Sequence, residues 1–161
     1  MPLFAQDLAA VLDDAGVTQR AVIGGMSFGG MIALQFAVDF PQRTHALILS
    51  DSVPRGATAP RDNYEPPRRG GLFDSMMLRP DLTPDLPAIT VPTLVIYGEH
   101  DQRIAEGVPA LAAGLQRRRI VCLSGCAHGT SSQRPDAWTE VVQAFLEDIE
   151  IGRPIEGELT K

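Results

Sequence analysis

A serine flanked by glycines stands where the chain changes from a strand-like to a helix-like pattern. Residues 25–29 read G-M-S-F-G, after an apolar run at 21–23 and before a helix-like stretch at 31–37. Such a sharp turn exposes a hydroxyl that can attack a carbonyl carbon, and glycines two positions away avoid collisions there. The N-terminus of the following helix would stabilise a developing oxyanion. Glycine-rich structural turns also match this motif, but the strand-to-helix setting favours Ser27 as a nucleophile.

Attack by a serine requires a base, and the chain has three histidines. His128 lies in a loop at 125–129, directly after an apolar segment that reads as a strand. This position places it at the C-terminal edge of a parallel sheet, the edge at which Ser27 also lies. His45 precedes a strand at the opposite edge, and His100 lies in a polar turn. We therefore interpret His128 as the base and the other two as surface residues.

The base needs an acid that orients it, and two aspartates directly follow predicted strands. Asp101 ends the segment 97–101, and Asp51 follows an earlier strand. Both are expected at the C-terminal edge of the sheet. Asp101 is favoured because its strand should neighbour the strand that leads to His128, while Asp51 stays the rival. Glu99 is interpreted as a solvated turn residue.

The elements that must position these residues alternate between strands and helices. This alternation predicts a three-layer α/β fold, in which an open parallel sheet of about four strands lies between flanking helices. The expected strands lie at 21–24, 45–49, 93–97 and 120–123. The expected helices lie at 3–15, 28–40, 106–116 and 135–151.

Two of these helices carry a clear apolar stripe. The first is expected to bury one face, made up of Phe4, Leu8, Val11, Leu12 and Ala15. The last is expected to pack on the sheet through Trp138, Val141, Val142, Phe145, Leu146 and Ile149.

Residues 1–151 are expected to form one core and 152–161 a surface tail. The segment 52–92 differs in composition, because eight of the thirteen prolines fall in it. Within it, 72–78 could form an amphipathic turn that lines an acyl pocket as a small lid. Filling a gap over the core is the commoner use of such a segment.

The composition narrows the class of protein. A chain of 161 residues with 44% hydrophobic residues is expected to form one globular domain, and its net charge of −6 disfavours a nucleic-acid partner. The basic run 117–119 is interpreted as a helix cap or solvated turn. No stretch approaches the roughly 20 apolar residues of a membrane span, so we expect no membrane partner and a cytoplasmic location. Cys122 and Cys126 lack partners for a zinc site or a disulfide framework, and no cofactor or metal is expected.

With Ser27, Asp101 and His128 in this chain order, the sequence resembles the α/β-hydrolase superfamily. The segments that carry the resemblance are 25–31, 92–101 and 126–128. The chain is similar to the branch that contains 3-oxoadipate enol-lactonases, esterases and carbon–carbon bond hydrolases, over residues 3–151.

The resemblance implies a catalytic triad in which Ser27 sits on a nucleophile elbow and the backbone N–H of Phe28 binds the oxyanion. It also implies several strands before the nucleophile strand and a larger cap, both of which are lost or shortened here. The second oxyanion donor belongs to that portion, and loss of one donor typically costs about 10²–10³ in rate. We therefore expect weak activity from a monomer, and a homodimer or a complementing chain that covers the exposed edge and face.

Three functions follow as hypotheses. The first is a serine hydrolase that acts on a small carboxylic ester, lactone or related carbonyl substrate. The second is a non-catalytic remnant that serves as an interaction or oligomerising module. The third is a lyase or perhydrolase on the same scaffold, which the triad alone does not distinguish from an esterase.

Overall fold

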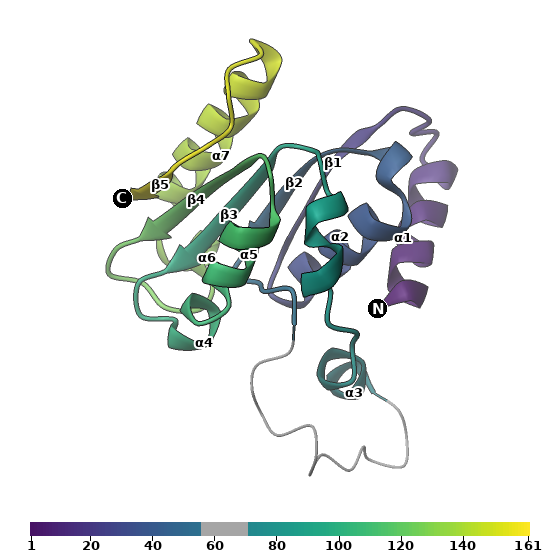
Figure 1. Ribbon diagram of the computed structural model, residues 1–161, viewed down its shortest axis with the longest axis horizontal. Coiled ribbons are helices and arrows are strands. Elements are labelled where there is room, and N and C mark those ends of the chain that lie inside the picture. The colour runs from purple at the N-terminus through teal and green to yellow at the C-terminus, as the bar shows by residue number, and fades with distance from the viewer. Residues whose placement is uncertain (56–70) are drawn as a thin grey trace.

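Strands and helices alternate along the computed structural model, which describes residues 1–55 and 71–161. In these ranges five parallel strands form one sheet in the order β1-β2-β3-β4-β5 (Figure 1). The strands are β1 (Ala21–Met26), β2 (Thr44–Ser50), β3 (Thr93–Gly98), β4 (Arg118–Leu123) and β5 (Glu158–Thr160). Because all five strands run parallel, their C-terminal ends lie at one edge of the sheet.

The α-helices are α1 (Pro2–Asp14), α2 (Phe28–Asp39), α3 (Leu72–Met77), α4 (Gln102–Ala105), α5 (Val108–Gly114), α6 (Thr130–Gln133) and α7 (Pro135–Glu150). The described residues also form the 3₁₀ helices η1 (Pro41–Arg43) and η3 (Thr83–Ala88). Proline occupies the first turn of α1, α5 and α7, where its missing N–H leaves no helical hydrogen bond unmade.

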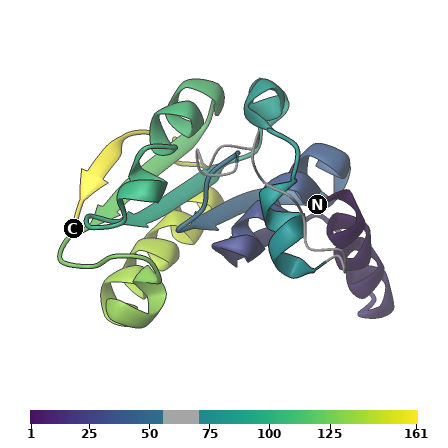
Figure 2. The same cartoon turned by 90° about the horizontal axis from the view of Figure 1, so that it is seen from below.

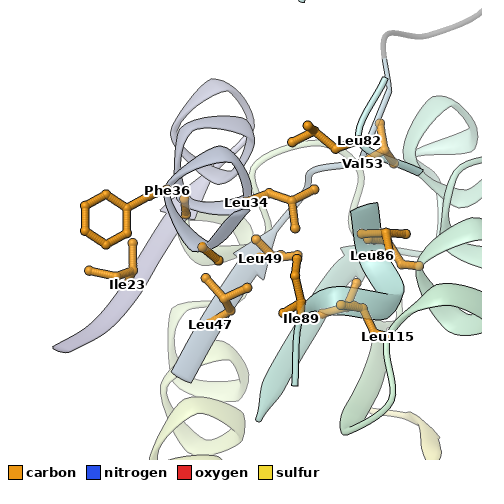
Figure 3. Close-up of a cluster of buried hydrophobic side chains, with 14 of the residues drawn as sticks. Ile23, Leu34, Phe36, Leu47, Leu49, Val53, Leu82, Leu86, Ile89 and Leu115 are labelled. Carbon is orange, nitrogen blue, oxygen red and sulfur yellow. The ribbon is translucent and has the colours of Figure 1, made fainter. Parts of the chain in front are cut away.

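Helices cover both faces of the sheet, so the fold has the three layers of an α/β protein. Figure 2 shows α7 on one side of the strands and α5 on the other. The larger core joins one face of the sheet to α1, α2, η3 and α5, and its central side chains converge in Figure 3. The second core packs the other face against α7, through Ile96, Val121 and Phe145 among others. Strands β2 and β3 are buried on both faces, which explains their unbroken apolar runs.

The structure differs from the sequence expectations in three elements. In α1 the buried positions are Ala5 and Ala9, and Leu8 and Leu12 of the expected face pack against the same core while partly buried. Val11 is 62% exposed, so the buried face is rotated from the expected one. The helix expected at 106–116 is the shorter α5, preceded by the single turn α4. The tail contributes β5, which pairs with β4 although all three of its residues are exposed.

The expected proline-rich segment 52–92 contains α3 and η3, and its residues 56–70 lie outside the described ranges. Among the residues that the structure describes, no helix combines the length and apolar character that crossing a membrane requires.

Candidate active site

Ser27 occupies the turn between β1 and α2 with a backbone conformation that side chains rarely adopt. Its φ is 52° and its ψ is −114°. The turn is held by the Ser27 N–H, which donates to the Ser50 carbonyl at 2.8 Å, and by the Ser27 carbonyl, which accepts from Met31 N–H at 3.1 Å. The first bond anchors the turn to the end of the neighbouring strand β2, and the second begins helix α2.

The glycines around Ser27 have different reasons to be glycine. A Cβ on Gly25 would lie 2.3 Å from the Gly29 carbonyl carbon, and one on Gly30 would lie 2.5 Å from Ser52 Cβ. A Cβ on Gly29 would meet no described atom within 4 Å. The expectation that both glycines of the motif avoid collisions is therefore wrong for Gly29. Close packing requires a glycine at position 25 and at position 30, which lies one residue beyond the motif.

His128 joins Ser27 to Asp101 across three loops. Its Nε2 lies 2.9 Å from Ser27 Oγ, and its Nδ1 lies 2.6 Å from Asp101 Oδ2. An ionised carboxylate only accepts hydrogen bonds, so Nδ1–H donates to Asp101 and leaves Nε2 to accept the Ser27 hydroxyl proton. The structure thus brings together all three residues that the sequence singled out, in the order nucleophile, base and acid.

The Asp101 side chain is fixed from two sides. It is 7% exposed, whereas the His128 side chain is 48% exposed. Its Oδ1 accepts from the Ile104 N–H at 3.4 Å at the start of α4, so its second oxygen faces His128. Asp101 is therefore an oriented acceptor beside a base that is open to small molecules.

The loop that carries His128 approaches β3 closely because β3 ends in Gly98. A Cβ on Gly98 would lie 2.4 Å from the Ala127 carbonyl oxygen. The His100 N–H donates to the Cys126 carbonyl at 2.9 Å, which fastens the two loops together. This contact sets the distance between the Asp101 and His128 backbones.

Side chains hold the histidine loop at its other end. The Gln133 side chain accepts from the Ala127 N–H at 3.1 Å and donates to the His128 carbonyl at 2.6 Å. Glu99, expected to be only solvated, accepts from the Gly125 N–H at 2.8 Å. Sequence reasoning missed these supports because amide and carboxylate side chains in polar loops carry no pattern that names their partners.

Asp51 lies at the same edge without touching the Ser27–His128 pair. It follows β2 directly, is 0% exposed, and has φ of 51°. Its Oδ2 accepts from Ser50 Oγ at 3.0 Å, from the Thr130 N–H at 3.1 Å and from Thr130 Oγ1 at 2.8 Å. The hydrogen bond to His128 therefore goes to Asp101 and not to Asp51, its rival at the sequence level.

The position expected for an oxyanion donor is the first residue of α2. Phe28 begins this helix, and the N–H groups of a first helical turn have no partner within the helix. The Phe28 ring packs edge-on against Phe4 of α1, with centroids 5.3 Å apart at 85°. A hollow of about 520 Å³, lined by Met1, Phe4, Leu72 and Leu78 among others, lies between α1 and α3.

One group of described residues could offer three ligand atoms to a metal. Carboxylate oxygens of Asp51 and Asp101 and a ring nitrogen of His128 lie within 4.8 Å of one another. An ion bound at about 2.0–2.2 Å by both Asp101 and His128 would hold their atoms farther apart than a hydrogen bond does. The observed 2.6 Å contact suits a shared proton.

The cysteines are poor rivals to Ser27. Both Cys122 and Cys126 are free thiols. Burial raises the pKa of the Cys126 thiol, and its Sγ donates to the Leu123 carbonyl at 3.2 Å. A buried neutral thiol is a weak nucleophile.

Solved structures share the fold of this protein over most of the chain. The model of the alpha/beta hydrolase fold family matches residues 1–69. The structure is similar to that of a thermophilic esterase from Thermogutta terrifontis, with a TM-score of 0.75, 25% identity, and coverage of 90% of this chain and 71% of the esterase.

Two relatives are similar in sequence. A 2-hydroxy-6-oxononadienedioate/2-hydroxy-6-oxononatrienedioate hydrolase from Pseudomonas sp is 23% identical, covering 89% of this chain and 68% of that protein. Its match extends over 194 residues, more than the 161 of this chain, so it has additional residues within the matched region. A homoserine O-acetyltransferase from Thermus thermophilus is 46% identical over 52 residues, which cover 30% of this chain and 13% of that protein.

These matches agree with the parallel sheet and its flanking helices, and a hydrolase and an esterase are among the relatives that match most of the chain. The chain has the α/β-hydrolase fold, and the family model matches its sequence over residues 1–69.

Proposed function

We propose that this protein is a serine hydrolase that acts on a small carboxylic ester, lactone or related carbonyl substrate. The observation that carries the proposal is the continuous contact from Ser27 Oγ to His128 Nε2 at 2.9 Å and from His128 Nδ1 to Asp101 Oδ2 at 2.6 Å. The 25% identical esterase structure supports the ester class.

In the first half of the reaction, Ser27 Oγ attacks the substrate carbonyl carbon while His128 Nε2 takes the hydroxyl proton. Asp101 stabilises the imidazolium that forms, and the Phe28 N–H donates to the oxyanion. When the tetrahedral intermediate collapses, the bond to the leaving oxygen breaks and His128 returns the proton to that oxygen. The product of this half is an alcohol and an acyl-Ser27 ester.

In the second half, water attacks the acyl carbon and His128 Nε2 takes its proton. The bond to Ser27 Oγ breaks, the proton returns to Ser27, and a carboxylic acid leaves. The 48% exposure of His128 leaves the base open to water for this step.

The hollow between α1 and α3, which is lined mainly by apolar residues and also by Asp74 and Arg79, supports a substrate with an apolar acyl or alcohol group. It borders Phe4, whose ring contacts Phe28 next to the nucleophile. Its side chains include Leu72, which is 61% exposed, and Leu78, which is 55% exposed. These residues belong to the segment 72–78, for which the sequence left open a small lid over an acyl pocket or a filler over the core.

Labelling with a fluorophosphonate tests the proposal. The reagent should phosphonylate Ser27, as located by mass spectrometry of tryptic peptides, and the adduct should be lost in Ser27→Ala. Hydrolysis of p-nitrophenyl acetate above the buffer rate should be lost in both Ser27→Ala and His128→Ala. A folded protein that neither reacts with the probe nor hydrolyses the ester contradicts the proposal and favours a non-catalytic interaction module.

Acyl transfer is a second candidate, favoured by the 46% identity to a homoserine O-acetyltransferase over 52 residues. The acyl-Ser27 ester would then pass its acyl group to a hydroxyl other than that of water. Added small alcohols should in that case yield new esters in preference to acid, as measured by product chromatography. A perhydrolase would pass the acyl group to added peroxide and form a peracid, whereas a lyase would form neither the acid nor the new ester from a simple ester substrate.

Association with a second copy of the chain belongs to the same proposal. In the described residues β1 pairs only with β2, so its other edge has unpaired backbone groups. On the face that α7 leaves open, Val22 is 39% and Met26 is 43% exposed. A hollow of about 390 Å³ between Met26, Ile48 and Trp138 continues this apolar surface. A homodimer that buries it would cover both features.

A further inference from the structure

A second buried carboxylate accompanies the proposed acid at the edge of the sheet. Asp51 is 0% exposed and follows β2, the strand between the Ser27 strand and the Asp101 strand. One of its carboxylate oxygens lies within 4.8 Å of both an Asp101 oxygen and a His128 ring nitrogen. His128 therefore has two acidic neighbours, of which only Asp101 is hydrogen-bonded to it.

The Oδ2 atom of Asp51 accepts three hydrogen bonds. The donors are Ser50 Oγ, the Thr130 N–H and Thr130 Oγ1. The Ser50 hydroxyl can give its proton to Asp51 because it accepts from Trp138 Nε1 at 3.1 Å. Three donors on a single oxygen match an ionised carboxylate, which only accepts.

The Oδ1 atom of Asp51 differs from Oδ2 in its hydrogen bonding. Asp51 Oδ1 is buried and has no hydrogen-bond partner in the described part of the chain. A buried acceptor without a donor is unfavourable, and such groups in native proteins call for a functional or structural reason. A carboxylate oxygen of Asp51 lies within 4.8 Å of a His128 ring nitrogen, so the imidazole is a donor close to this carboxylate.

A purely structural role for Asp51 accounts for half of these contacts. The bonds to Thr130 tether the loop that carries His128, two residues earlier in the chain. That tether uses Oδ2 alone, and an asparagine oxygen could accept the same bonds. Neither the charge nor the unpartnered Oδ1 is required by it.

We propose that Asp51 is a positioning residue for His128: its carboxylate supports the imidazolium beside Asp101, and its Oδ1 accepts the Nδ1–H bond when Asp101 is absent. This inference rests on the proposed function, in which His128 is the base. No further reactant is needed, because the proton stays on His128 and only its acceptor changes. The prediction is that Asp51 can replace Asp101 as the acceptor of the His128 Nδ1–H bond.

The test compares Asp101→Asn, Asp51→Asn and the double variant in the full chain. Without a second carboxylate, an asparagine at the acid position favours the wrong imidazole tautomer and lowers the rate by about 10⁴-fold. We expect Asp101→Asn to lose less than about 10²-fold in the rate of Ser27 phosphonylation, and the added Asp51→Asn to remove at least another ~10-fold. Equal rates for Asp101→Asn and the double variant would overturn the inference.

A spectroscopic readout separates this inference from the proposed function. Long-range ¹H–¹⁵N NMR of the imidazole, assigned by loss of the signal in His128→Gln, reports which ring nitrogen carries the proton. We expect Nδ1–H in the native protein and in Asp101→Asn, and Nε2–H in the double variant. Nε2–H in Asp101→Asn alone would overturn the inference even if Asp51→Asn did not fold. Because NMR requires no turnover, a native protein that fails to label Ser27 contradicts the proposed function without deciding this test.

Thr130→Val in the Asp101→Asn background is the matched control. It removes the Thr130 Oγ1 bond and keeps the Asp51 charge. The phosphonylation rate should stay well above that of the double variant. A fall to the rate of the double variant would assign Asp51 to tethering the loop and contradict the inference.

Discussion

Ser27 and Asp51 share an uncommon backbone conformation at the ends of neighbouring strands. They are the two non-glycine residues in the described ranges with positive φ, at 52° and 51°. Such a residue costs on the order of 1–3 kcal/mol and persists where its surroundings determine it. For Ser27 those surroundings are the bond to the Ser50 carbonyl and the close approach of Gly25 and Gly30. For Asp51 they include its N–H bond to the Ile96 carbonyl at 2.8 Å.

Alanine at Gly25 and at Gly29 tests this account of the turn. Gly25→Ala places Cβ 2.3 Å from backbone that cannot yield, so we expect it to lower the free energy of unfolding by about 1–3 kcal/mol. Gly29→Ala has space and lies in helix α2, so it should be neutral or stabilise by up to about 1 kcal/mol. Urea denaturation measures both. Equal destabilisation by the two substitutions would contradict the packing argument.

At the scale of elements, α7 is the helix that closes the second core, and an ion-pair network fixes its C-terminal end. Phe145 is 0% exposed against the sheet. Asp148 contacts Arg119 of β4 at 2.8 Å and also pairs with Arg153 beyond the helix. The network joins helix, sheet and tail at the point where the chain turns toward β5.

Asp148 gives this network a defined pH dependence. The hydrogen bond from Arg119 lowers the pKa of Asp148 below its ordinary value of 3.8, which the unfolded chain retains. A carboxyl with a lowered pKa in the folded state contributes stability above pH 3.8, and the contribution is lost as the pH falls through the folded pKa. Asp148→Asn should therefore lower the urea midpoint at pH 7, and the difference from the native protein should shrink below pH 3.8. A difference that is independent of pH would contradict the role of this charge.

At the scale of the whole molecule, the two edges of the sheet differ. At one edge β5 covers β4, although Leu159 is 51% exposed. At the other edge the outer side of β1 has no partner strand in the described residues and lies beside the apolar surface of Val22 and Met26. This asymmetry favours the β1 edge for the proposed dimer, because two copies can pair there about a twofold axis.

Introducing positive charges into the apolar surface at β1 tests the dimer. Light scattering of the native protein should give twice the mass of the chain. Val22→Lys with Met26→Lys should reduce it to the mass of one chain, because burying two ammonium groups in an apolar interface is unfavourable. Leu159→Lys, on the β5 edge, is the matched control and should leave the dimer intact. A native protein that has the mass of one chain contradicts the proposed association.

Local pattern was enough to predict much of the fold and the members of the candidate site. Apolar runs marked β1 to β4, and those of β2 and β3 are unbroken because these two strands are buried on both faces. The glycine spacing around Ser27 and the positions of Asp101 and His128 just after predicted strands can each be recognised within a short segment. The sequence alone was therefore enough to name all three residues. Their roles in catalysis stay predictions until Ser27 is labelled.

Other features depend on contacts between distant segments, which only the tertiary structure decides. Gly25 and Gly29 look alike in the motif, and the packing of Ser52 and the turn makes Gly25 and Gly30 the constrained pair. Asp51 and Asp101 both follow strands, and the approach of the His128 loop to Gly98 selects Asp101. Strand β5 has exposed residues without alternation, so its pairing comes from where α7 delivers the chain. Sequence patterns report burial within one element, whereas partner choice is set by which elements the fold brings together.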